Sequence, residues 1–161
     1  MIGNAENVVR VLFPNKILHG KVMGGAFALR PYREESDLSV FRLSGTTFKN
    51  DIQALDKGRN LDCAKMGVSA IRAINLMKDH DIATCDVIES GDVKVTSHAG
   101  IVTYINSQQL IGGHESEIEL QDKHGASLNA LILAVQHRLV AIAQLGLTNV
   151  SFICFQNDKK D

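Results

Sequence analysis

Tryptophan is absent from this chain of 161 residues, and aromatic residues make up only 5% of it. Aliphatic side chains must therefore supply most of the hydrophobic core. Proline is nearly as rare, with Pro14 and Pro31 alone, and no linker, low-complexity stretch or internal repeat divides the sequence. A chain of this length buries a core without disulfides or metals. These absences predict one domain over residues 1–156 and a polar tail over 157–161.

An excess of charge is also missing. The chain has 17 Lys and Arg against 18 Asp and Glu, which gives a formal net charge of −1. Proteins that bind nucleic acid through bulk electrostatics are usually strongly basic, so the balance gives that class no support. Nucleic-acid binding would require a local face made by the basic residues of the first part of the chain: Arg10, Lys16, Lys21, Arg30 and Arg33.

Cysteines are few, and no CxxC pair is present. Cys63, Cys85 and Cys154 lie far apart in apolar contexts, which favours reduced, buried thiols in a cytoplasmic protein. The N-terminus lacks the basic start and the long apolar stretch of a signal peptide. The segment 128–145 approaches membrane-spanning length, but the sequence "QHR" at its centre would be costly in lipid. We therefore predict a cytoplasmic protein without a membrane span.

Short apolar segments alternate with helical ones, which indicates an α/β or α+β fold with a mixed sheet. "DLSVFRL" is apolar on both faces between Leu38 and Leu43, as in a strand covered on both sides. A helix capped by Thr46 or Thr47 follows, and another is expected after Ser69. Further strands are expected over 82–88, over 93–105 as one or two strands, and over 117–125.

The last third of the chain contains the strongest pattern. "SLNALILAVQHRLVAIAQLG" predicts a long helix over about 127–145, with Ser127 as its cap and Gly146 as its stop. "NVSFICF" predicts a terminal strand. Because the helix is apolar almost all round, it is either the central helix of the fold or a subunit interface. The sequence leaves both alternatives open.

Arg42, His98 and Ser39 are the candidate site residues. Arg42 ends the apolar strand just before "SGTT", so its guanidinium, with the amides of a helix N-terminus, suits a phosphate or carboxylate. The alternative is an arginine paired with a carboxylate such as Asp51 or Asp56. His98, in "TSHAGIV", has the chemistry of a general base, and its alternative is a histidine bonded at a turn. Ser39 becomes a third member if the other two are neighbours.

The remaining motifs predict neither a metal nor a cofactor site. The histidines at 19, 80, 114, 124 and 137 do not match a familiar metal-ligand spacing. The glycines in "GKVMGGAFALR" form neither a Walker motif nor GxGxxG. We interpret them as a bend that allows close strand packing.

Four segments occur in a fixed order: "GKVMGGAFALR", "LSV", "MGVSAIRAINL" and "HAGI". Over about residues 18–102 this order resembles a pattern in small, uncharacterised bacterial and phage-borne proteins. The resemblance implies a prokaryotic or phage origin and a gene neighbourhood concerned with mobile elements or defence. It implies no mechanism, but it includes Ser39, Arg42 and His98 in the shared part. Gly100 and Asn75 depart from the usual residues of that pattern.

Two functions are therefore expected. The first is a cytoplasmic accessory or protein-interaction module, as in defence, toxin–antitoxin or mobile-element loci, that binds a protein partner or itself through helix 128–145. The second is a small enzyme of nucleotide or phosphoester chemistry in which Arg42 holds the anion and His98 moves a proton. The second function requires Arg42 and His98 to share a cleft.

Overall fold

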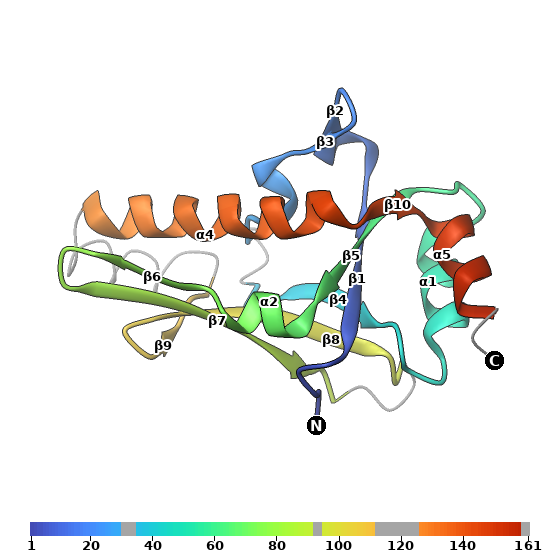
Figure 1. Cartoon of the computed structure of the whole chain (residues 1–161), viewed down its shortest axis with the longest axis horizontal. Helices are drawn as coiled ribbons and strands as arrows, with labels where there is room; N and C mark the ends of the chain where they lie inside the picture. The colour runs from blue at the N-terminus through green and yellow to red at the C-terminus, as the bar shows by residue number, and fades with distance from the viewer. Residues whose placement is uncertain (30–34, 92–94, 112–125, 159–161) are drawn as a thin grey trace.

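The computed structural model describes residues 1–29, 35–91, 95–111 and 126–158, which form one α+β fold (Figure 1). Eight strands make one sheet in the order β10-β5-β1-β4-β8-β7-β6, and β9 pairs with β8. The strands are β1 (Asn7–Leu12), β4 (Leu38–Arg42), β5 (Asp62–Gly67), β6 (Asn75–Lys78), β7 (Asp81–Glu89), β8 (His98–Ile105), β9 (Gln108–Gln109) and β10 (Leu147–Asn149). Every described pairing is antiparallel, so the mixed sheet that we predicted is wrong.

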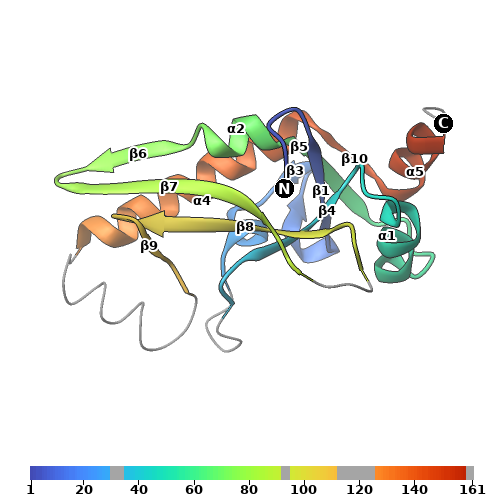
Figure 2. The same ribbon diagram turned by 90° about the horizontal axis from the view of Figure 1, so that it is seen from below.

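Helices cover the two faces of the sheet unequally (Figures 1 and 2). The helices are α1 (Phe48–Asp56), α2 (Val68–Arg72), α4 (Ala126–Leu145) and α5 (Val150–Asp158). The long α4 runs along one face and packs on a core that includes Val8, Val40 and Ile101. On the opposite face, α1 and α5 enclose a smaller cluster around Phe41 and Phe48.

A small hairpin stands beside the C-terminal half of α4 (Figure 1). It consists of β2 (Ile17–Leu18) and β3 (Lys21–Val22), between the 3-10 turns η1 (Pro14–Lys16) and η2 (Gly24–Phe27). Gln144 of α4 holds it in place: Val22 N–H donates to Gln144 Oε1 at 2.9 Å, and Gln144 Nε2 donates to the Gly20 carbonyl at 3.2 Å. The hairpin and α4 are therefore joined by the backbone of one and a side chain of the other.

Strand β4 lies between two neighbours in the middle of the sheet, as its apolar sequence predicted. Leu38 and Val40 point into the core under α4, whereas Phe41 points into the cluster under α1. Helix α1 follows after residues 43–47. Thr47 stands at its N-cap position, but its side chain makes no capping hydrogen bond, and the helix ends at Asp56, before Lys57, whose φ of 54° is left-handed. The predicted covered strand and the short helix after it are confirmed.

The C-terminal segment differs in part from the prediction. The helix α4 and a terminal strand are both present, but the strand β10 is confined to Leu147–Asn149, and most of "NVSFICF" belongs to helix α5. Val150, Ile153 and Cys154 are its buried residues. Their spacing is helical, and the β-branched and aromatic content of the run concealed it. The strand predicted over 117–125 lies outside the described residues.

The helix expected after Ser69 is also shorter than predicted. Helix α2 ends at Arg72, and Asn75–Lys78 forms strand β6 in a hairpin with β7. Ile71 and Ile74 are buried, but Met77 is 70% exposed. Pairing with β7 therefore overrides the helical spacing of these apolar residues.

The three cysteines are free and buried, as predicted. Burial, with a smaller contribution from Cys154, raises the pKa of the Cys63 thiol to about 12. Burial also raises the pKa of Cys85 despite its contact with Thr103. Since only the thiolate is strongly nucleophilic, burial keeps these two side chains in the less reactive thiol form, and they pack in the two core clusters.

Candidate functional site

Arg42, at the end of β4, is engaged by carboxylates of the same chain. Its Nε and Nη2 donate to the two oxygens of Glu6 at 2.9 and 3.0 Å, and its Nη1 lies 3.3 Å from Glu89 Oε1. This is the bidentate geometry in which a guanidinium binds a carboxylate. The anion-binding fork that the sequence suggested is thus occupied by Glu6, and neither Asp51 nor Asp56 is the partner.

Glu6 is the centre of this polar network. Besides Arg42, it accepts hydrogen bonds from the Gly3 N–H at 2.6 Å and from the Ser44 hydroxyl at 2.9 Å. Partial burial pushes its pKa up, but these donors and the charge of Arg42 outweigh burial, so the pKa of Glu6 lies below its ordinary value. The network fixes residues 3–6 against the end of β4.

His98 and Ser39 lie on the other face of the sheet. His98 pairs with Phe41 in the β4–β8 register, and the centroids of their rings are 6.0 Å apart. Ser39 pairs with Gly100, two residues along the same row, and its side chain is exposed. A Cβ at position 100 would collide with the side chain of Asp37, which explains why glycine stands there.

Strand alternation places the Arg42 side chain opposite to that of Phe41, and therefore opposite to that of His98. Ser39 and His98 share a face, but no described hydrogen bond joins their side chains. The structure thus does not bring the three predicted residues into one cleft. The geometric requirement of the phosphoester-enzyme hypothesis is not met.

The motifs "SGTT" and "TSH" do meet, through residues for which the sequence suggested other roles or none. Asp51 Oδ2 accepts from the Ser97 hydroxyl at 2.5 Å and from the Thr47 hydroxyl at 2.6 Å, and Thr47 lies 2.8 Å from Thr96. Ser97 is fully buried. A hydroxyl without access to solvent or substrate serves to dock α1 onto the segment before β8. The hydroxyls of "SGTT" and "TSH" were the only sequence signal for this contact.

Helix α4 presents a second kind of candidate site, a surface. Its buried residues follow one stripe, Leu128, Leu131, Val135, Leu139 and Ala143, which packs against the sheet. Seven residues on the remaining surface are exposed, and we call them the outer face of α4: Asn129, Leu133, His137, Arg138, Ala141, Gln144 and Leu145. The helix is therefore a core element on one side and open on the other.

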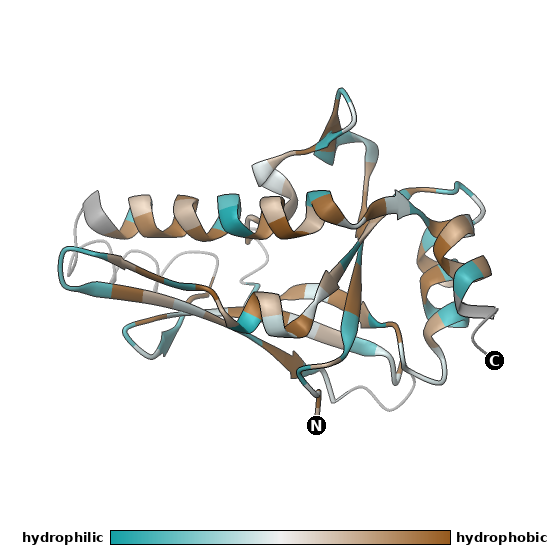
Figure 3. Ribbon diagram, in the orientation of Figure 1, coloured by the Kyte–Doolittle hydropathy of each residue, from teal (hydrophilic) through white to brown (hydrophobic). Residues whose placement is uncertain are grey.

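The outer face is unusually poor in charge. Arg138 is its one Asp, Glu, Lys or Arg residue, while Leu133 and Leu145 are 54% and 92% exposed. Figure 3 shows α4 pale or brown along most of its length. By length and composition alone Leu128–Leu145 would suffice to cross a membrane, yet only 28% of it is buried in this chain. Surface helices normally turn charged residues toward water.

The basic and the metal-ligating candidates of the sequence lie partly outside the described residues. Arg10 donates to the Ala26 and Ser39 carbonyls and stacks on Phe27, and Arg30 and Arg33 lie outside the described residues, as do His114 and His124. Where the structure is described, no three His, Cys, Asp or Glu side chains are placed to hold a metal ion. A comparison with protein-family models, curated proteins and solved structures finds no match for this chain.

Proposed function

We propose that this protein is a small cytoplasmic interaction module that pairs with a second copy of itself through the outer face of α4. The observation that carries the proposal is a nearly uncharged, partly aliphatic helix face with two large exposed leucines. Burying such a face removes apolar surface from water, which favours association. The resemblance to phage-borne and bacterial proteins supports a setting in a defence or mobile-element locus.

The outer face is complementary to itself. In a two-fold, antiparallel pair centred on His137, each residue meets the one equally far from position 137 on the other copy. Leu133 then meets Ala141 of the other copy, so that a large side chain faces a small one at both ends of the contact. A second copy thus fits the sequence of this face without an unpaired acidic group or a clash of large residues.

The helix alone is too small for a stable interface. A helix of 20 residues is about 30 Å long and about 10 Å wide, so its outer face offers roughly 300 Å² against about 800 Å² per partner in a standard interface. In the antiparallel pair, the β2–β3 hairpin beside the C-terminal half of α4 reaches the N-terminal half of the other α4. It adds Leu18 and Met23, which are 53% and 41% exposed. The proposal therefore expects a concentration-dependent dimer.

A membrane is the competing partner for an apolar helix. A span through lipid is incompatible with this packing, because α4 lies lengthwise on the sheet and continues into β10, which pairs with β5. Shallow binding to a membrane surface would use Lys and Arg on the flanks of an apolar face, and α4 carries Arg138 alone. A second copy is therefore the favoured occupant.

Sedimentation velocity of three forms of the protein tests the proposal. Leu133→Glu places a charge on the outer face, where it would meet Ala141 of the other copy, whereas Met77→Glu places the same charge at a 70% exposed apolar residue of β6. We expect the unchanged protein and Met77→Glu to dimerise with rising concentration. We expect Leu133→Glu to stay monomeric, because pairing would bury an uncompensated carboxylate.

Three results would overturn the proposal. The unchanged protein could remain monomeric at all concentrations, or Leu133→Glu could dimerise as well as Met77→Glu does. The protein could also remain monomeric and co-sediment with vesicles of anionic phospholipid, with this binding lost in Leu133→Glu. The outer face would then bind a membrane surface and not a second copy. Circular dichroism of Leu133→Glu confirms that a loss of pairing reflects the interface and not unfolding.

A further inference from the structure

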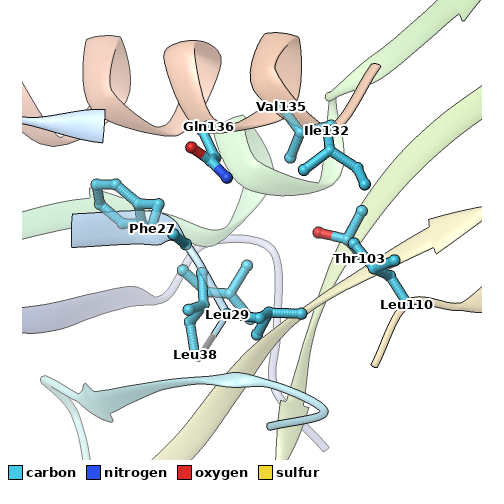
Figure 4. A pocket seen from close by; sticks show the side chains of 10 residues that line it. Phe27, Leu29, Leu38, Thr103, Leu110, Ile132, Val135 and Gln136 are labelled. Atoms are coloured by element: carbon cyan, nitrogen blue, oxygen red, sulfur yellow. The ribbon is translucent and has the colours of Figure 1, made fainter. Parts of the chain in front are cut away.

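A pocket lies between α4 and the sheet, on the face opposite to the outer face of α4 (Figure 4). Its volume is about 80 Å³. The walls come from four distant parts of the chain: residues 27–29 after η2, Leu38 of β4, β8 with Leu110, and one face of α4. The cavity therefore exists only in the folded chain, at the point where β1 and β4 separate after pairing over two residues.

Two polar side chains point into this pocket, and the other side chains that line it are apolar. Figure 4 shows the Gln136 amide entering from α4 and the Thr103 hydroxyl entering from β8. Gln136 forms no hydrogen bond with the described residues, and the partner of Thr103 is the Cys85 thiol, with 3.6 Å between Oγ1 and Sγ. Thiols are weak hydrogen-bonding groups. Thr103 is only 8% exposed, so both groups retain hydrogen-bonding capacity that a bound molecule would satisfy.

The lining also defines the charge and size of a ligand. None of the ten lining residues is ionisable, and an ionised group would lose its hydration there without a counter-charge. An engineered apolar cavity of about 150 Å³ takes the six carbon atoms of a benzene ring, so about half that volume encloses an aliphatic body of about three carbon atoms, and the head of the ligand lies toward the opening of the pocket. An apolar wall with a few converging polar groups is the usual composition of a small-molecule site.

We propose that this pocket binds a small uncharged molecule with a short aliphatic body and a carboxamide or hydroxyl head, held by Gln136 and Thr103. The Gln136 amide offers both a donor and an acceptor, and the Thr103 hydroxyl adds a second group at the opposite wall. The aliphatic body lies against Leu38, Leu110 and Ile132. This site is separate from the outer face of α4, and the proposal does not depend on self-association.

The test is a titration of the full chain with butyramide, followed by NMR of the methyl groups of Ile101, Leu110 and Ile132. Butyramide has six heavy atoms, so we expect saturable shifts with a dissociation constant of about 1 mM. Butyrate has the same body and an ionised head, and we expect it to bind at least roughly tenfold more weakly. The comparison uses the unchanged protein and needs no variant.

Variants assign the hydrogen bonds. Thr103→Val and Gln136→Leu keep the shape of each side chain and remove its polar atoms, and each is expected to weaken butyramide binding by about fivefold. Thr84→Val, on β7 outside the pocket lining, is the matched control and should leave binding unchanged. Absence of saturable shifts at these methyl groups, equal binding of butyrate, or folded pocket variants that bind like the unchanged protein would each overturn the proposal.

Discussion

At the end of α4, two backbone segments lie so close together that only glycine fits at position 146. Gly146 follows the helix and lies against β5: the Lys65 N–H donates to the Gly146 carbonyl at 3.0 Å. A Cβ on Gly146 would overlap the backbone carbonyl of Lys65, a part of the sheet that cannot rotate away. The glycine that stops the helix in the sequence is therefore also required for docking of the helix end onto the sheet.

Gly146→Ala is accordingly expected to destabilise the fold by about 3 kcal/mol, since overpacking against backbone forces the chain to shift. The matched control is Gly67→Ala in β5, where the nearest atom to a Cβ is Asn7 Oδ1 at 3.8 Å. Urea unfolding measures both variants. Similar midpoints for the two variants would show that the α4–β10 junction tolerates a side chain.

Glu6→Gln is expected to lower the free energy of unfolding by about 1 to 2 kcal/mol at pH 7, because hydrogen bonds to a charged group are lost. The folded pKa of Glu6 lies below its ordinary value of 4.5. The carboxylate therefore stabilises the fold fully above pH 4.5, and this contribution disappears as the pH falls through the lowered pKa.

The difference between the unchanged protein and Glu6→Gln should close in acid, which urea unfolding at several pH values measures. Glu89→Gln is the comparison, because Glu89 is 50% exposed and makes one longer contact of 3.3 Å with Arg42 besides its ion pair with the N-terminal ammonium, so we expect a smaller loss of stability than for Glu6→Gln. A difference for Glu6→Gln that persists undiminished below the lowered pKa would contradict this account of Arg42.

Among the elements, Gln144 of α4 makes two described hydrogen bonds to the backbone of the β2–β3 hairpin, beside the apolar packing of Val22 in the core. Gln144→Leu removes both hydrogen bonds to the hairpin backbone and leaves the helix-forming character of the position unchanged. We expect the Val22 amide to exchange with solvent about five to ten times faster in this variant. Gln136→Leu, about two turns earlier in α4, is the control. It should leave the exchange rate of the Val22 amide unchanged. Equal exchange rates of the Val22 amide in the unchanged protein and in both variants would show that Gln144 does not hold the hairpin.

The elements also show how far the sequence alone reaches. Strand β4, helix α1 and helix α4 were predictable, because apolar runs and terminating residues agreed there. The predicted capping was wrong in both helices, since Thr47 makes no capping hydrogen bond and Ser127 lies inside α4. Strand β6 and helix α5 were not, since short apolar runs suit both structures and pairing with β7 or packing under β5 decides between them. The partner of Arg42 lies 36 residues away at Glu6, a separation that local patterns cannot reveal.

On the scale of the whole molecule, the predicted site residues do not share a cleft, and the two candidate binding regions are the pocket under α4 and the outer face of α4. Because His98 pairs with Phe41, strand alternation places Arg42 and His98 on opposite faces. The sequence does not reveal this pairing, so it could not predict the separation. The pocket combines four distant segments, so no motif predicted it. Helix α4 was expected to be either core or interface, and the structure gives it a buried stripe and an open face. The open face is the basis of the proposed pairing.

Disulfide trapping measures that pairing most directly. The native cysteines are buried, so a single cysteine on the outer face of α4 reports contacts between copies. His137→Cys stands at the proposed two-fold axis, where two equivalent cysteines come within disulfide range, whereas Asn129→Cys stands two turns away. Under mild oxidation we predict covalent dimers from His137→Cys and few from Asn129→Cys. Equal or absent cross-linking at both positions would contradict the antiparallel pair.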